Sequence, residues 1–242
     1  MSAVFKQPSH IKYHHNSDDF YQGSEAWLAA RCGLLTASEM KLIITPSLKV
    51  AANEKTRTHL YELLAQRVNK YVEPHYINDD MMRGHDDEVI AKELYAKYKK
   101  VRVDEMGFIT NDKWGFTLGF SPDGLIGDDG FIECKSRRQK FQFETIIECV
   151  KGQKIPLDYL MQQQTGHLVS ERAWCDFLSF SGGIGMPVIR VYPDEKVMDA
   201  IVQASGEFER QLSQKWHEYT EALNSGVMFI PTERRNILEM QL

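Results

Sequence analysis

The feature that most constrains this chain is the stretch at 119–138, which has the pattern of a glycine-rich hairpin carrying two carboxylates and a lysine. Apolar pairs on both sides of Gly127–Gly130 are typical of two short antiparallel strands joined by a tight turn. Alternation with a period of two then places Glu133 and Lys135 on one face of the second strand and Cys134 on the other. The hairpin therefore groups charged side chains in the way that a metal site needs.

The pairing of this hairpin decides whether Asp123 joins the group. A simple turn centred on Asp128–Asp129 pairs Asp123 with Cys134, which leaves Asp123 on the wrong face for Glu133. We therefore expect one bulge, and Gly124 is the natural place for it. Asp-Gly turns and Glu-x-Lys strands are also common in solvated hairpins, so this pattern alone leaves a purely structural interpretation open.

The arrangement Asp123-x9-Glu133-x-Lys135 resembles the motif of PD-(D/E)xK nucleases, and the wider pattern resembles their phage lambda exonuclease (YqaJ-type viral recombinase) branch. The resemblance covers residues 22–223. It rests on six short pieces in the family's order and at similar separations, which are Trp27-x3-Arg31-x-Gly33, Thr36-Ala37-Ser38-Glu39, Arg83-Gly84-x3-Glu88, Ser121-Pro122-Asp123-Gly124, Glu133-x-Lys135 and Tyr159-x2-Gln162-x-Gln164.

The resemblance implies both a fold and an activity. The implied fold is of the α/β class, with a restriction-endonuclease-like core in which helices flank a central mixed β-sheet. The implied activity is Mg²⁺-dependent hydrolysis, with Mn²⁺ as a substitute, that degrades one strand of linear double-stranded DNA from 5' to 3' and releases mononucleotides. The implied partners are DNA ends, two further copies in a homotrimer, and a single-strand annealing protein of phage-type recombination.

The same resemblance assigns roles to residues of the hairpin and of one later helix. Asp123, Glu133 and the main-chain carbonyl of Cys134 are the implied metal ligands, and oxygen donors suit Mg²⁺. Lys135 is implied to orient the attacking water and to offset negative charge. Gln162 is implied to help position the lysine and the water.

Glu88 is implied to be an accessory carboxylate near a second metal position. The pattern at 86–100 predicts a helix with Glu88 in its first turn, where the helix dipole favours an acid whatever its function. For this residue the structural explanation and the catalytic one both stay open.

The implied DNA contacts come from four residues. Arg31 and Ser38 are implied to hold the terminal 5'-phosphate, and Ser121 and Arg137 complete the expected set. The segment 36–39 has the form of a capping box, which predicts a helix whose N-terminus offers backbone amides to a phosphate. Arg137 belongs to a short basic run, and such a run is more often a solvated segment.

Periodicity predicts the remaining elements. The expected helices span 24–31, 54–70, 86–100, 157–170 and 194–223. The expected strands outside the hairpin span 101–103, 107–110, 114–120, 174–181 and 187–192. The segments 71–83 and 141–156 show no clear pattern, and we expect irregular connections there.

Length and composition limit the organisation of the chain. Its 242 residues, 43% of them hydrophobic, can bury one sizeable core, so we expect one nuclease domain at 21–223 between a polar arm at 1–20 and a tail at 224–242 that meets a neighbouring subunit. The four scattered cysteines favour reduced thiols over a zinc ribbon or an iron-sulfur site. With neither a membrane span nor a signal peptide in the pattern, we expect a cytoplasmic protein of a bacterial host or prophage.

The net charge of −5 is unusual for a DNA-binding protein and requires that acidic side chains be segregated from the DNA path. Two other functions remain open at this stage. One is a structure- or sequence-specific endonuclease of the same fold, which needs no pocket for an end phosphate. The other is a DNA-binding protein without catalysis, which would give no magnesium-dependent product.

Overall fold

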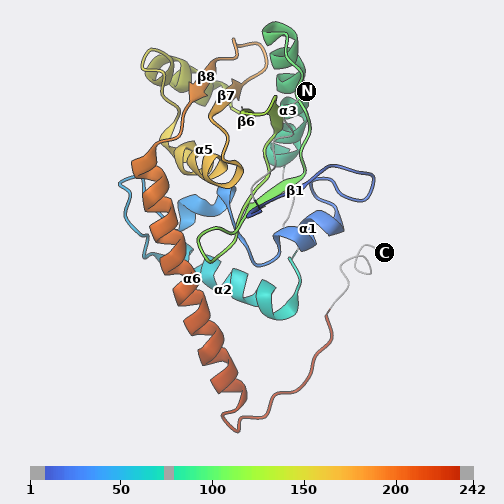
Figure 1. Ribbon diagram of the computed structural model, residues 1–242, viewed down its shortest axis with the longest axis vertical. Helices are drawn as coiled ribbons and strands as arrows, with labels where there is room; N and C mark the ends of the chain where they lie inside the picture. Colours follow the sequence, from blue (N-terminus) through green and yellow to red (C-terminus); the bar gives the residue numbers. More distant parts are fainter. Residues whose placement is uncertain (1–8, 74–78, 235–242) are drawn as a thin grey trace.

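Two mixed four-stranded sheets flanked by helices form the centre of the fold, which the computed structural model describes for residues 9–73 and 79–234 (Figure 1). This arrangement confirms the expected α/β class, although the strands form two hydrogen-bonded sheets and not one. The helices are α1 (Glu25–Arg31), the 3-10 helix η1 (Ala37–Leu42), α2 (Glu54–Asn69), α3 (Asp79–Lys99), α4 (Gln139–Glu144), the π-helix η2 (Thr145–Val150), α5 (Leu157–Ser170) and α6 (Glu195–Leu223). The strands are β1 (Ile11–His14), β2 (Leu35–Thr36), β3 (Phe108–Asn111), β4 (Leu118–Phe120), β5 (Gly124–Ile126), β6 (Gly130–Ser136), β7 (Trp174–Phe180) and β8 (Val188–Val191).

The first sheet has the order β1-β3-β4-β2, and of its pairs only β2 with β4 is parallel. The second has the order β5-β6-β7-β8, and only β6 with β7 is parallel. The chain passes from the end of β4 at Phe120 to the start of β5 at Gly124 within a few residues. Ser121 and Asp123 therefore lie at the point where the two sheets meet.

Alternation along β6 gives its two faces different surroundings. Phe131 packs on Phe120 with ring centroids 5.1 Å apart, in the large core cluster that also takes in residues of α5. Ile132 and Cys134 belong to a second cluster together with Tyr95 of α3. The predicted separation of Glu133 and Lys135 from Cys134 is therefore confirmed.

The hairpin differs from its expected pairing by one residue. Gly124 pairs with Ile132, and Ile126 pairs with Gly130, around a three-residue loop that starts at Gly127 with a left-handed φ of 53°. Continued by one step, this register sets Asp123 level with Glu133. The expected register and the expected bulge at Gly124 are thus wrong, because an odd loop already supplies the shift that the bulge was needed for.

Helix α5 runs between the two sheets and contacts β3 and β4 of the first and β7 of the second. Its approach depends on Gly166, since a Cβ there would lie 2.9 Å from the ring atoms of both Phe120 and Phe131. This close packing fixes the helix that carries Gln162.

Several expected elements are confirmed, and others are corrected. The helices predicted at 24–31, 54–70, 157–170 and 194–223 and the strands predicted at 174–181 and 187–192 are present within about two residues of their expected bounds. Helix α3 begins at Asp79, seven residues before its expected start, and 141–156 contains helical turns. The segment 101–103 is not a strand, and only Asp104 bridges to Leu125.

The ends of the chain also differ in part from expectation. Ile11–His14, placed in the polar arm, forms β1 and pairs with β3. Residues 1–8 of the expected arm, residues 74–78 and the part of the expected tail beyond 234 lie outside the described residues. From the C-terminal end of α6 the chain at 224–234 runs on without helix or strand (Figure 1). None of the helices in the described ranges is long and apolar enough to cross a membrane.

Candidate active site

One cavity of about 510 Å³ lies where α1, η1, α3, the β5–β6 hairpin and α5 meet. It brings together residues that are more than a hundred positions apart in the sequence. The residues that line it and enter the argument below are Trp27, Arg31, Thr36, Ser38, Glu88, Ser121, Asp123, Glu133, Cys134, Lys135 and Gln162.

Glu133 is the centre of the polar contacts inside this cavity. Its Oε1 accepts a hydrogen bond from Lys135 Nζ at 2.5 Å and another from Gln162 Nε2. The residue is only 1% exposed, and its second oxygen, Oε2, has no hydrogen-bond partner among the described residues. A buried carboxylate oxygen without a donor is costly, so the site suits a cation at this position.

Asp123 lies beside Glu133, held by the backbone of the neighbouring strand. Its Oδ2 accepts a hydrogen bond of 2.5 Å from the Cys134 N–H. Burial raises the pKa of Asp123 well above its usual range, and the charges of Glu133 and Glu88 raise it further. Burial also raises the pKa of Glu133, against the opposing effect of Lys135. The carboxylates thus repel one another in surroundings of low polarity.

Lys135 is kept as a cation by these neighbours. Burial alone lowers the pKa of a lysine, but the charges of Glu133 and Asp123 outweigh it and raise the pKa of Lys135 above its usual value. Its ammonium also lies 5.6 Å from the ring centroid of Tyr159 on α5. The side chain can therefore donate hydrogen bonds and offset charge, but it is not placed to act as a general base.

Glu88 reaches the cavity from the middle of α3 and not from a first turn. The helix begins at Asp79, so the expected dipole argument for an acid at this position is wrong. Glu88 pairs with Lys92 at 3.0 Å, one turn further along α3. Lys92 was missed in the sequence, although an acid followed four residues later by a lysine on a helix is a known pairing signal.

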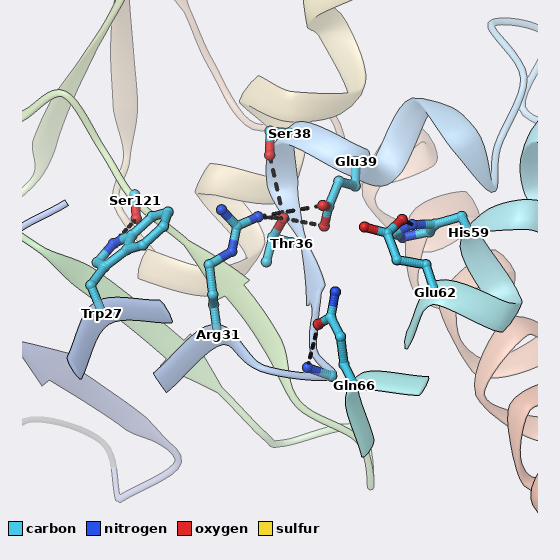
Figure 2. Close-up of polar contacts among 10 residues, drawn as sticks. Trp27, Arg31, Thr36, Ser38, Glu39, His59, Glu62, Gln66 and Ser121 are labelled. Atoms are coloured by element: carbon cyan, nitrogen blue, oxygen red, sulfur yellow. Dashed lines mark hydrogen bonds and ion pairs between the residues drawn. The ribbon is translucent and has the colours of Figure 1, made fainter. Parts of the chain in front are cut away.

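A second group of polar side chains lies in the same cavity, contributed by α1, β2 and η1 (Figure 2). Arg31 stacks on the Trp27 ring, with its guanidinium carbon 4.6 Å from the ring centroid, and Trp27 is only 7% exposed. Arg31 Nη2 donates to Thr36 Oγ1 at 3.3 Å, and Ser38 Oγ lies 3.3 Å from the same hydroxyl. The structure thus brings Arg31 and Ser38 together around Thr36.

The expected capping box at 36–39 is wrong. Thr36 precedes a six-residue 3-10 helix and makes no side-chain cap, because its hydroxyl donates to Glu39 Oε2 at 2.6 Å instead. In the capping box the two side chains bond to the backbone, whereas here they bond to each other. The phosphate-binding potential of this segment therefore lies in its side chains.

Of the two remaining expected DNA contacts, one lines the cavity. Ser121 Oγ accepts from Trp27 Nε1 at 3.1 Å (Figure 2). The same hydroxyl donates to the Gly107 carbonyl at 2.8 Å. Arg137 is not among the lining residues, because its guanidinium donates to the Tyr159 hydroxyl at 2.9 Å and packs against that ring. The structure therefore supports a place in the cavity for Ser121 but not for Arg137.

The donors fit a divalent cation bound through a mixed set of ligands. Within the described parts of the chain, no three histidine, cysteine, aspartate or glutamate side chains are arranged to hold a metal by themselves. Asp123 and Glu133 provide two carboxylates, and the main-chain carbonyl of Cys134 lies next to them in sequence. An ion that uses backbone oxygen and water in addition to carboxylates matches this set.

Comparisons with known proteins agree with this geometry. The chain is similar to an alkaline exonuclease, LHK-Exo, from Laribacter hongkongensis, with 27% identity and a TM-score of 0.73 over 84% of this chain and 100% of the other. The same protein in complex with dAMP gives 29% identity and a TM-score of 0.73 over the same shares. A phage related exonuclease from Haemophilus somnus 129PT shares the fold, with 14% identity and a TM-score of 0.53 over 75% of this chain and 96% of the other.

A search of curated proteins finds no match. The sequence model of the YqaJ-like viral recombinase domain matches residues 26–173, which include the hairpin, all of α5 and every residue that was expected in the site. This match covers more than half of the chain, and the resemblance suggested by the short sequence pieces is confirmed. The chain belongs to the YqaJ-like viral recombinase family.

Proposed function

We propose that this protein is a Mg²⁺-dependent exonuclease that degrades one strand of linear double-stranded DNA from its 5' end. The observation that carries the proposal is that one cavity holds two carboxylates, a lysine and, beside them, an arginine with three hydroxyl groups. The first group suits phosphodiester hydrolysis, and the second suits a terminal phosphate. Similarity to the alkaline exonuclease LHK-Exo supports the same class of reaction.

The metal would be held by Asp123, Glu133 and the carbonyl of Cys134. When bound, a divalent ion supplies a water of lowered pKa and offsets the negative charge that builds up on the phosphate. The unsatisfied Oε2 of Glu133 and the mutual repulsion between the carboxylates support this assignment. Mg²⁺ is the proposed ion, and Mn²⁺ is its proposed substitute.

The side chains around the carboxylates keep them in place and balance their charge. Gln162 and Lys135 both donate to Glu133 Oε1, which leaves Oε2 available. Lys135 stays protonated, so it orients the water and stabilises the phosphate charge in the transition state. Glu88 lines the same cavity and its charge raises the pKa of Asp123, which supports its proposed role as an accessory carboxylate.

The second group of side chains supports the proposed direction of digestion. We propose that Arg31 binds the 5'-terminal phosphate, with the hydroxyls of Ser38, Thr36 and Ser121 around it. A guanidinium can give phosphate two parallel hydrogen bonds. An end held in this way presents the next phosphodiester to the carboxylates, and hydrolysis there releases a 5'-mononucleotide.

A comparison of two DNA forms tests the proposal. Linear duplex should release mononucleotides when Mg²⁺ is present and none in EDTA, and label placed at the 5' end should leave before label at the 3' end. Covalently closed duplex should stay intact under both conditions. Cutting of the closed form would instead indicate an endonuclease, and binding of DNA without any product would indicate a non-catalytic protein.

Assembly and context belong to the same proposal. We propose a homotrimer that encloses the duplex, a single-strand annealing protein as partner, and a cytoplasmic place of action in phage-type recombination. Arg137 remains a proposed DNA contact, one that needs its guanidinium to leave Tyr159. The nuclease domain is proposed to span 21–223.

A further inference from the structure

Glu39 binds two members of the proposed phosphate pocket without lining the cavity itself. Figure 2 shows the Arg31 guanidinium between the Trp27 ring and the Glu39 carboxylate. Arg31 Nη2 lies 3.4 Å from Glu39 Oε1, and the two side chains are 23% and 25% exposed. Glu39 is thus a half-buried carboxylate beside the arginine that is expected to hold a phosphate.

The hydrogen bonds among Arg31, Thr36 and Ser38 lead to Glu39 as the final acceptor. Thr36 has one hydroxyl proton and donates it to Glu39 Oε2 at 2.6 Å. The Thr36 oxygen can then only accept, so it takes a hydrogen bond from Arg31 and one from Ser38. One nitrogen of Arg31 and the hydroxyl protons of Thr36 and Ser38 are therefore turned toward Glu39, either directly or through Thr36.

We propose that Glu39 is a specificity-determining counter-charge that weakens the hold of the pocket on a 5'-phosphate and so lets the mononucleotide product leave. The inference rests on the proposed function. An exonuclease must release a 5'-phosphate from this pocket after every cut, and a tight pocket would stall on its own product. As the product leaves, Arg31 and Thr36 form their hydrogen bonds with Glu39 again.

The charge and the shape of Glu39 have opposite effects on phosphate binding. Its oxygens orient Arg31 and Thr36, which favours binding. Its negative charge opposes that of the phosphate at short range and in partly buried surroundings, which disfavours binding. Replacing Glu39 by glutamine removes the charge and keeps an oxygen for the Thr36 hydroxyl, while an NH2 group replaces the oxygen that accepts from Arg31.

The test is the affinity of purified full-length protein for dAMP and for deoxyadenosine, measured by calorimetry at a fixed Mg²⁺ concentration. We expect Glu39→Gln to bind dAMP roughly three- to tenfold more tightly than the wild type, with deoxyadenosine unchanged. A gain in affinity is a result that mere damage to the fold does not produce. Glu209→Gln is the matched control, because Glu209 pairs with Arg67 at 2.6 Å outside the cavity, and it should bind dAMP like the wild type.

Equal or weaker binding of dAMP by Glu39→Gln would overturn the inference, as would dAMP binding to neither protein. If the glutamine variant does not fold, Glu39→Met, of similar length and without charge, takes its place. Release of mononucleotides by the wild type is measured separately. Its absence would count against the proposed function, whereas the dAMP comparison judges Glu39 alone.

Discussion

Lys135 is fixed as a cation by the carboxylates around it, so its loss should remove charge and water positioning without removing a metal ligand. We expect Lys135→Ala to lower turnover of linear duplex by a factor of a hundred or more, in line with the loss of a group that stabilises the transition state. The Mg²⁺-dependent rise in melting temperature should remain. Lys151→Ala, a change at an exposed position, should digest normally. Near-normal digestion by Lys135→Ala would contradict the assigned role.

Ionisation of Asp123 in its buried position opposes folding. Its pKa is raised by burial first and by Glu133 and Glu88 next, so the stability of the metal-free protein should fall as the pH rises above the ordinary value of 3.8. We expect Asp123→Asn to be more stable than the wild type by on the order of 1–2 kcal/mol in EDTA at pH 8, because the asparagine carries no charge. The advantage should shrink toward pH 4. Thermal melts across this range measure it.

The same pair of proteins also tests the metal site. Addition of Mg²⁺ should raise the melting temperature of the wild type, since a bound ion stabilises only the folded state, and should have little effect on Asp123→Asn. An asparagine variant that is less stable than the wild type in EDTA, or one that still responds fully to Mg²⁺, would show that the carboxylates are not organised around a cation.

Arg31 should discriminate between the two kinds of 5' end. Its loss should cost on the order of 1.5–3 kcal/mol of positioning, or roughly ten- to a hundredfold in rate, on DNA with a 5'-phosphate. Digestion of 5'-hydroxyl DNA by Arg31→Ala should change little. Arg57→Ala, an exposed arginine of α2, is the control. Equal slowing on both substrates would mean that Arg31 supports the fold or the general DNA path.

The residues that the sequence could predict are those whose positions follow from local spacing. Glu133 and Lys135 share a strand face because strands alternate, and Asp123 is one hairpin step away. Glu39 was seen only as a helix cap, and Lys92 was missed. The contacts of Glu39 are side-chain bonds that propensity does not encode, whereas the spacing of Glu88 and Lys92 is a signal that could have found their pair. Arg137 lies outside the cavity with its guanidinium bonded to the Tyr159 hydroxyl, a position that the basic run in the sequence did not indicate.

At the scale of elements, strongly periodic helices were predictable and short or irregular ones were not. Helix α5 has its predicted bounds, and α6 starts one residue after its predicted cap at Asp194. Apolar residues show no helical spacing in the sequence of the first turns of α3. The helical segment η2 after α4 is too short to show such a spacing. The β5–β6 register depends on the number of residues in the loop. An error of one residue in that number moves the side chains of one strand to the opposite face relative to the other strand.

Gly166 gives a prediction at this scale, because it sets how closely α5 approaches the sheets. Although alanine favours a helix, its Cβ here would lie 2.9 Å from both phenylalanine rings, so we expect Gly166→Ala to destabilise the fold by about 1–3 kcal/mol. Gly206→Ala is the matched control, since its Cβ meets only Phe116 at an ordinary 3.5 Å. That variant should be as stable as the wild type or more so. Equal melting temperatures for the two would contradict the packing argument.

For the whole molecule, the net charge of −5 requires that the few basic side chains near DNA act together. Enclosure of the duplex by several copies achieves this, and we expect the protein to sediment as a trimer. The last part of α6 and the segment after it offer a surface for such contacts, with Trp216 and Phe229 exposed. A monomeric mass at micromolar concentration, combined with long runs of digestion per encounter, would show that enclosure is not the mechanism.

The hydrogen bond from the Cys134 amide to Asp123 links the proposed metal site to the sheet. The carboxylate continues the β5–β6 ladder one step beyond Gly124, in the place that a backbone carbonyl would otherwise take. The proton of this amide can exchange with solvent only when the first proposed metal ligand moves away. Its hydrogen-exchange rate therefore reports how often the proposed metal site opens, and it can be followed without substrate, product or turnover.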